Sequence, residues 1–248
     1  MIFAHRGANR EAAENTRSAF ERSLAYPIDG IETDIQLSRD GVPVLWHDDF
    51  LDKLGLADKC IDDFDFEQLE GMDVAAHFFP GSEPEGLMGL QAMIENYYQR
   101  CRLLLEIKTH DRETLSRREE KVRKTLDMAR MAHDEMIMAS SFDLASLIYA
   151  KQYAPDFPLI YNLEPEQSMF DVQHVLAEQP YLHGLCLPIE ILDQEIVRLI
   201  RAQHKIIVVY TCNTDEEIGR ALRLGVDILI SDVPRTALQA RAVMVEAK

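Results

Sequence analysis

The sequence predicts an α/β protein that forms a closed (β/α)8 barrel of the TIM type, and three observations support this. Eight short apolar runs alternate with amphipathic segments along the whole chain. Such alternation is typical of a parallel sheet covered by helices, and eight repeats are the number that closes the sheet into a barrel. The length of 248 residues suits one barrel domain. A doubly wound open sheet is the alternative, although no Gly-rich dinucleotide loop follows the first strand.

The predicted strands are short and rich in Ile, Leu and Val, and they cover residues 2–5, 30–36, 102–108, 135–140, 158–162, 183–187, 206–210 and 226–230. The predicted helices lie between them, at residues 15–25, 90–100, 112–132, 144–153, 165–178, 193–202, 215–224 and 235–246. Three residues fit helix ends: Asn15 and Asp215 at N-termini, and Gly225 just after a C-terminus.

One segment interrupts the alternation. About forty residues separate His47 from the helix expected at residue 90, which is too long for an ordinary connection in a compact domain. We therefore expect one domain over residues 1–248 with a small insertion at about 51–89. Its own apolar residues are Phe64, Phe66, Leu69, Met72, Phe78 and Phe79. It is either a lobe near the barrel mouth or a packed excursion without a functional role.

Composition excludes several classes of partner. The chain has 43 acidic and 26 basic residues and a net charge of -17. Such a surface repels polyanions, so we expect neither nucleic-acid binding nor stable association with anionic membranes. The four scattered cysteines lack metal-binding or redox spacing, which favours reduced thiols and a cytoplasmic location. No apolar run approaches the roughly 20 residues that span a bilayer. The oligomeric state is not predicted.

Charged residues interrupt two of the apolar strands. Glu32 and Asp34 are two residues apart on one predicted strand, so they share a face, and Glu106 follows Leu103-Leu104-Leu105 on the next. Burial of an unpaired carboxylate costs several kcal/mol, so this pattern predicts a bound cation. Oxygen ligands favour a hard divalent ion, Mg²⁺ or Ca²⁺. The structural alternative is a set of ion pairs with Arg6 and Lys108, which leaves three acids against two bases.

Two histidines stand beside these strands. His5 and Arg6 end the first predicted strand, and His47 ends the extended segment 43–46. The ends of barrel strands meet at one rim, so we expect these residues to converge with the carboxylates. Imidazoles are suited to proton transfer near neutral pH, and Arg6 and Lys108 are suited to bind phosphoryl oxygens. Together the residues predict a metal-dependent hydrolytic site for an anionic ester.

The order of motifs resembles the glycerophosphodiester phosphodiesterase family from residue 2 to about residue 234. The motifs are His5-Arg6-Gly7, Glu14-Asn15-Thr16, Glu32-x-Asp34-x-Gln36-Leu37-Ser38-x-Asp40-Gly41-x-Pro43-Val44-x-x-His47-Asp48, Leu105-Glu106-Ile107-Lys108, Ser141-Phe142, Tyr210-Thr211-Cys212-Asn213 and Gly225-Val226-Asp227-x-x-x-Ser231-Asp232-x-Pro234. The first blocks are specific, and the later ones are weak alone.

The resemblance implies a TIM barrel with a small insertion after the second strand. It implies hydrolysis of small-molecule glycerophosphodiesters to glycerol 3-phosphate and an alcohol, within lipid and glycerol metabolism. Glu32, Asp34 and Glu106 resemble the metal ligands, and His5 and His47 the acid–base pair. We assign His5 as proton acceptor and His47 as donor, although the sequence does not fix this order. The residues that resemble phosphate or substrate contacts are Arg6, Lys108, Tyr210, Asn213 and Ser141.

Some positions depart from the family pattern and leave the preferred substrate open. Ala13 replaces a usual Pro, Lys53-Leu54 replaces Arg-Thr, and Tyr210 replaces a common Trp. Two rival functions remain: a related barrel phosphodiesterase that acts on lysophospholipid, and a non-catalytic barrel that binds phosphodiesters. An intact histidine pair argues against the second rival, because a binding protein needs no proton transfer.

Overall fold

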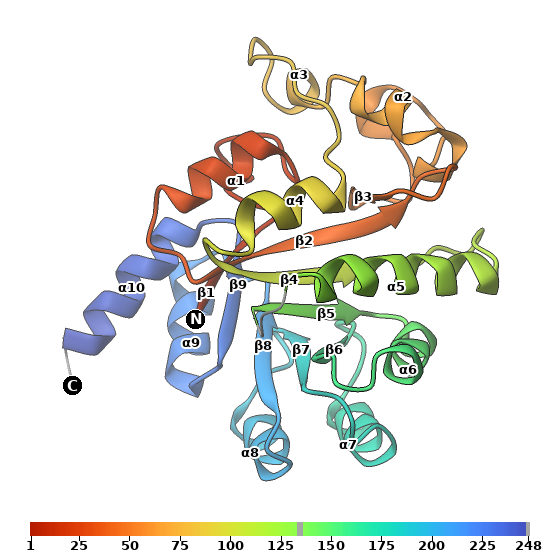
Figure 1. The fold of residues 1–248 in the computed structure, drawn as a ribbon. Coiled ribbons are helices and arrows are strands. Elements are labelled where there is room, and N and C mark those ends of the chain that lie inside the picture. The colour runs from red at the N-terminus through yellow and green to blue at the C-terminus, as the bar shows by residue number, and fades with distance from the viewer. Residues whose placement is uncertain (133–135, 247–248) are drawn as a thin grey trace.

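The computed structural model, which describes residues 1–132 and 136–246, is a closed parallel barrel (Figure 1). Each barrel strand pairs in parallel with its neighbour, and β1 pairs with both β2 and β9, which closes the sheet. This confirms the predicted (β/α)8 architecture over the open sheet. The barrel strands are β1 (Ile2–His5), β2 (Gly30–Leu37), β4 (Arg102–Ile107), β5 (Ile137–Ser141), β6 (Leu159–Asn162), β7 (Gly184–Pro188), β8 (Ile206–Tyr210) and β9 (Ile228–Ser231).

Helices surround this barrel and follow the strands along the chain (Figure 1). They are α1 (Arg17–Leu24), α4 (Leu90–Tyr97), α5 (Leu115–Arg130), α6 (Leu144–Tyr153), α7 (Met169–Glu178), α8 (Gln194–Ala202), α9 (Asp215–Leu224) and α10 (Pro234–Glu246). The predicted bounds of β1, β8, α6 and α9 agree with those observed, and the other elements shift by a few residues. The start predicted for the fifth strand, residue 135, lies outside the described residues.

At two helices the capping residue lies one position from the residue predicted for the helix end. Thr16, not Asn15, caps α1, and its hydroxyl accepts a hydrogen bond from the backbone of Ala19. Asn15 has a left-handed backbone with φ 59°, so it lies outside the helix. At α9 the cap is Thr214, and Asp215 is the first helical residue. In both cases a hydroxyl next to the predicted residue satisfies the free N–H groups of the first turn.

The barrel interior explains how β1, β2 and β4 carry polar groups at one end. Phe3, Leu104 and Ile160 belong to an apolar cluster inside the barrel. Gly30 makes room for the Phe3 ring, since a Cβ there would lie 2.5 Å from it. Side chains alternate along a strand, so the residues two positions later, His5 and Glu106 among them, share the inward direction nearer the carboxyl ends. The polar side chains therefore lie at the carboxyl ends of the strands, next to the apolar cluster that fills the barrel.

The long connection after β2 forms the expected insertion. β3 (Pro43–Leu45) pairs antiparallel with β2, and η1 (Asp52–Leu54), η2 (Ile61–Asp63), α2 (Phe66–Glu70) and α3 (Ala75–Phe78) follow it. Figure 1 shows α2 and α3 outside the ring of helices. The insertion has its own core, which packs on the β3 segment and includes Val44, Trp46, Leu51, Ile61, Leu69, Val74 and Leu87. The short helices were not predicted, and the single-domain boundary stays a prediction.

Two further observations concern the cysteines and the length of the helices. The four cysteines, Cys60, Cys101, Cys186 and Cys212, are free and buried, as expected for reduced thiols. Within residues 1–132 and 136–246, no helix combines the length and apolar character that a membrane-spanning segment requires.

Candidate active site

Three carboxylates meet at the carboxyl ends of two neighbouring strands. Glu32 and Asp34 extend from β2, and Asp34 is in register with Glu106 on β4. One oxygen from each side chain lies within 4.8 Å of the other two, and Glu32 and Asp34 are buried. The alternation along β2 and the parallel pairing with β4 are enough to bring these three groups together.

The carboxylates differ in how well they are paired. Asp34 Oδ2 lies 3.0 Å from Arg6 Nε and accepts a hydrogen bond from Asn15. Glu106 accepts hydrogen bonds from Lys108 at 2.8 Å and Asn162 at 3.1 Å. Glu32 Oε2 is buried without a hydrogen-bond partner. Ion pairing therefore accounts for two acids, and the third leaves an open oxygen in an all-oxygen cluster, which fits a hard divalent cation.

The electrostatics of the cluster lead to the same conclusion. Burial, together with the neighbouring charges of Asp34 and Glu106, raises the pKa of Glu32 well above its usual value. Burial also opposes ionisation of Asp34, but Arg6 and Lys108 beside it hold its pKa below the usual range. Negative potential is thus in excess at Glu32, where a cation would be most stabilised.

His5 is held by a carboxylate that directly follows the last barrel strand. Its Nδ1 lies 2.6 Å from Asp232 Oδ1, and its Nε2 lies 3.8 Å from Glu32 Oε2. Burial favours the neutral form of Asp232, but hydrogen bonds from His5 and Asn9 hold the pKa of Asp232 below its usual range. An ionised Asp232 can only accept a hydrogen bond, so it favours the tautomer with the proton on Nδ1 of His5; in that tautomer Nε2 carries a lone pair on the side of Glu32.

His47 has a similar arrangement. Its Nδ1 lies 2.7 Å from Asp48 Oδ1, and it lines a cavity of about 530 Å³ together with Glu106 and Lys108. His5 lines a smaller cavity of about 30 Å³, which Glu106 also lines. Glu106 of the carboxylate cluster therefore borders the cavity of each imidazole, and each imidazole has its Nδ1 atom in contact with an aspartate.

Arg6 and Lys108 are partly buried cations beside the cluster. Arg6 Nη1 lies 3.1 Å from Glu14, and Lys108 Nζ lies 3.9 Å from Asp34. Arg6 has a left-handed backbone with φ 55°, and Gly7 follows it with φ 82°. A Cβ at Gly7 would lie 2.7 Å from the backbone of α1, so only glycine fits this turn. The turn directs Arg6 into the site.

Three predicted substrate contacts make bonds within the protein. The Ser141 hydroxyl donates to the Ile107 carbonyl at 2.7 Å, and Asn213 donates to Asp232 at 2.9 Å. Tyr210 lines the smaller cavity, and its hydroxyl donates to the Leu163 carbonyl. Asn213 thus contacts Asp232, the carboxylate that binds His5, and Tyr210 forms part of the wall of the smaller cavity.

Sequence reasoning did not assign Asn15, Asn162 or the aspartates behind the histidines. Asn15 was taken as a helix cap, yet its amide joins Asp34 to Thr33. Asp232 belongs to the last of the motifs in the sequence, and the Ser231-Asp232 pair that follows β9 was a usable signal. Asn162 ends β6 and had no neighbouring motif, so nothing distinguished it.

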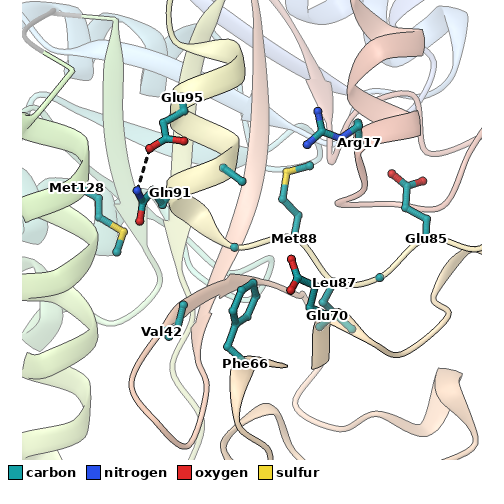
Figure 2. A pocket seen from close by; sticks show the side chains of 13 residues that line it. Arg17, Val42, Phe66, Glu70, Glu85, Leu87, Met88, Gln91, Glu95 and Met128 are labelled. Carbon is teal, nitrogen blue, oxygen red and sulfur yellow. Dashed lines mark hydrogen bonds between the residues drawn. The ribbon is translucent and has the colours of Figure 1, made fainter. Parts of the chain in front are cut away.

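Another pocket of about 530 Å³ lies between the insertion and helices α1, α4 and α5 (Figure 2). Phe66, Met88 and Met128 contribute apolar surface, and Glu70, Glu85 and Glu95 contribute acids. Glu95 accepts a hydrogen bond from Gln91. None of the predicted site residues lines this pocket. The pocket is therefore separate from the carboxylates and histidines at the carboxyl ends of the strands.

Comparison with known proteins agrees with this geometry. Residues 5–236 match the model of the glycerophosphoryl diester phosphodiesterase family. A glycerophosphodiester phosphodiesterase of Bacillus altitudinis is 28% identical over 255 residues, which cover 98% of each chain. Lysophospholipase D GDPD3 of Mus musculus is 28% identical over 268 residues, covering 96% of this chain and 80% of that protein. An Oleispira antarctica phosphodiesterase, solved with its product sn-glycerol-3-phosphate, superposes with a TM-score of 0.86 at 25% identity, covering 98% of this chain and 96% of that one.

Proposed function

The chain belongs to the glycerophosphoryl diester phosphodiesterase family, and we propose that it hydrolyses glycerophosphodiesters to glycerol 3-phosphate and an alcohol. One observation carries this proposal: a cluster of three carboxylates, one with a buried unpartnered oxygen, borders the cavities of two histidines, each of which contacts an aspartate. The product bound by the Oleispira phosphodiesterase supports the same substrate class.

In this proposal Glu32, Asp34 and Glu106 hold a divalent cation, Mg²⁺ or Ca²⁺. When bound, such an ion binds phosphoryl oxygens and stabilises the charge that develops in the transition state. Arg6 and Lys108 add hydrogen bonds to the same oxygens. The Arg6 and Lys108 side chains both lie within about 4 Å of Asp34, so they are beside the position that a phosphoryl group bound to the cluster would occupy.

The two histidines move protons. Asp232 keeps the His5 proton on Nδ1, so Nε2 accepts a proton from the attacking hydroxyl, whether water or the 2-hydroxyl of glycerol. In the second case the first product is a cyclic phosphate, and water then breaks its bond to the 2-oxygen to give glycerol 3-phosphate. Asp48 stabilises the protonated form of His47, which then gives its Nε2 proton to the leaving alcohol. Ionised partners at 2.6 Å and 2.7 Å make both steps favourable.

Two experiments test the proposal. Excess chelator should abolish release of glycerol 3-phosphate from glycerophosphocholine, and Mg²⁺ or Ca²⁺ should restore it. His5→Ala and His47→Ala should each lower the rate by about 10²-fold or more while metal affinity is kept. His174→Ala is a matched control. His174 is exposed on α7, where its ring stacks on Phe170, and it belongs to neither cavity of the site. Full turnover in chelator would remove the metal from the mechanism.

The lysophospholipid alternative rests on the mouse relative. The phenylalanines of the insertion argue against it, because Phe64, Phe66, Phe78 and Phe79 pack against the core of the insertion and are partly buried. Rates on water-soluble diesters should therefore exceed those on micellar lysolipid. The histidine–aspartate pairs argue against a non-catalytic barrel, for which binding without any product would be expected. We also propose a cytoplasmic location, which the four free thiols support.

A further inference from the structure

The insertion reaches the acid–base machinery through one side chain. Lys53 lies in η1, the first helical turn of the insertion. Its ammonium lies 2.8 Å from Asp48 Oδ2 and 3.0 Å from Glu14 Oε1, and 5.4 Å from the ring centroid of Phe78. The side chain is about two-thirds buried, so these contacts are sheltered from solvent. Lys53 is thus shared between two carboxylates and covered by an aromatic ring.

Each of these carboxylates also contacts a residue of the proposed mechanism. The other oxygen of Asp48 lies 2.7 Å from His47 Nδ1. The other oxygen of Glu14 lies 3.1 Å from Arg6, and Arg6 in turn lies 3.0 Å from Asp34. Charged contacts therefore run without a break from His47 to the carboxylate cluster. Lys53 therefore connects two charged pairs: Asp48 with His47, the proposed proton donor, and Glu14 with Arg6, the proposed phosphate contact.

The backbone around Lys53 holds it firmly in this position. Leu51, just before η1, is fully buried in the core of the insertion, and its N–H donates to the Lys59 carbonyl at 2.7 Å. Leu51 also pairs with Leu56 across the turn that contains Lys53. A cation on such a turn loses little conformational freedom when it binds two carboxylates, so it can fix their orientation.

We infer that Lys53 is a positioning residue that holds the Asp48–His47 pair and the Glu14–Arg6 pair in their working orientation. The inference rests on the proposed function. Without the ammonium, Asp48 and Glu14 lose the cation that they share, and Asp48 can rotate away from His47 Nδ1. Once Asp48 turns away, nothing holds the His47 ring through its Nδ1 atom, so its Nε2 proton is less well placed for transfer to the alcohol oxygen as the phosphorus–oxygen bond breaks.

The leaving group separates this role from a merely structural one. Choline leaves as a strongly basic alkoxide, so the Nε2 proton of His47 must move to its oxygen as the bond breaks. p-Nitrophenolate is a weak base and leaves without a proton. Loss of proton donation therefore slows the choline ester far more than the p-nitrophenyl ester. Disturbance of Arg6, or of the fold, slows both esters alike.

The experiment measures kcat/KM for glycerophosphocholine and for the p-nitrophenyl ester of glycerol 3-phosphate. We expect Lys53→Met to lose about 10²-fold on the choline ester and at least tenfold less on the nitrophenyl ester. Lys53→Arg should recover most of the loss, since a guanidinium can bridge both carboxylates. Asp48→Asn, which breaks the next contact, should show the same dependence on the leaving group even if Lys53→Met folds poorly.

Lys59→Met is the matched control, because Lys59 is an exposed lysine of the same insertion. It should leave both esters unchanged, and a leaving-group effect there would overturn the inference. Equal losses on the two esters in Lys53→Met, or no loss, would also overturn it. If the unaltered enzyme hydrolyses neither ester, the proposed function itself fails, which is a different result from an active enzyme that tolerates Lys53→Met.

Discussion

Replacement of Glu32 by glutamine gives a direct test of the carboxylate cluster. The substitution keeps the shape of the side chain and removes the charge of the one acid whose Oε2 atom is buried without a partner. If this oxygen binds a cation, the variant should lose metal-dependent stabilisation. If Glu32 has only a structural role, metal should act on the variant and on the unaltered protein in the same way.

The expected magnitudes follow from the geometry. Two like charges within 4.8 Å of each other at an effective dielectric constant of about 20 repel by about 3.5 kcal/mol or more. Glutamine removes this repulsion from each neighbour, so the metal-free variant should be at least as stable as the metal-free protein. A cation at about 100 times its Kd stabilises the unaltered protein by about 2.7 kcal/mol. For a domain of this size, that raises Tm by about 5–11 °C.

Thermal unfolding with and without Mg²⁺ or Ca²⁺ measures both effects. We expect the unaltered protein to show the increase and Glu32→Gln to show little of it. Glu164→Gln is the control, because Glu164 lines the neighbouring cavity but lies outside the cluster, so its metal-induced shift should be unchanged. A full metal-induced shift in Glu32→Gln would refute the assignment of this carboxylate as a ligand.

Three further predictions concern stability. Lys121→Met should lower the free energy of unfolding in urea by about 3–5 kcal/mol, because it strands the buried Glu113 carboxylate 2.5 Å away; a change near zero would contradict this pairing. Gly7→Ala should cost more stability than Gly55→Ala, since both have positive φ but only Gly7 would place its Cβ against the α1 backbone; equal losses would exclude the steric contribution. Burial favours the neutral form of Asp48, yet hydrogen bonds from its histidine and lysine neighbours lower its pKa from 3.8 to about 2. Its contribution is thus present above about pH 4 and lost as the pH falls toward 2, so acid titration of stability should be flatter in Asp48→Asn.

The barrel and the three carboxylates were predictable because both leave strong local patterns. Barrel strands are buried on both faces and read as short apolar runs. Against such runs, Glu32, Asp34 and Glu106 stand out, and strand alternation places two of them on one face without any tertiary information. The insertion gave a weaker pattern. Its helices span four and five residues, too few for a helical periodicity to emerge.

The pairing of His5 with its aspartate depends on the closed barrel and not on a local pattern. Asp232 lies 227 residues from His5, and the two meet only because the barrel closes between β1 and β9. Asn15 follows a similar rule: its sequence position suggests a helix cap, while its left-handed backbone turns the amide toward Asp34. Contacts of this kind depend on closure and loop geometry, which carry no periodic signal.

Charge balance reconciles the acidic chain with an anionic substrate. The protein carries a net charge of -17, which on its own would repel a phosphodiester. Within the site, however, three carboxylates lie close to Arg6 and Lys108, which leaves one negative charge in excess. A divalent ion in the cluster would turn that excess into one net positive charge, in a buried place where screening is weak. On the proposed function, the same count predicts that an ion is needed for substrate binding as well as for the chemistry. Without it, Arg6 and Lys108 only balance carboxylates, and no net positive charge is left to attract the phosphate.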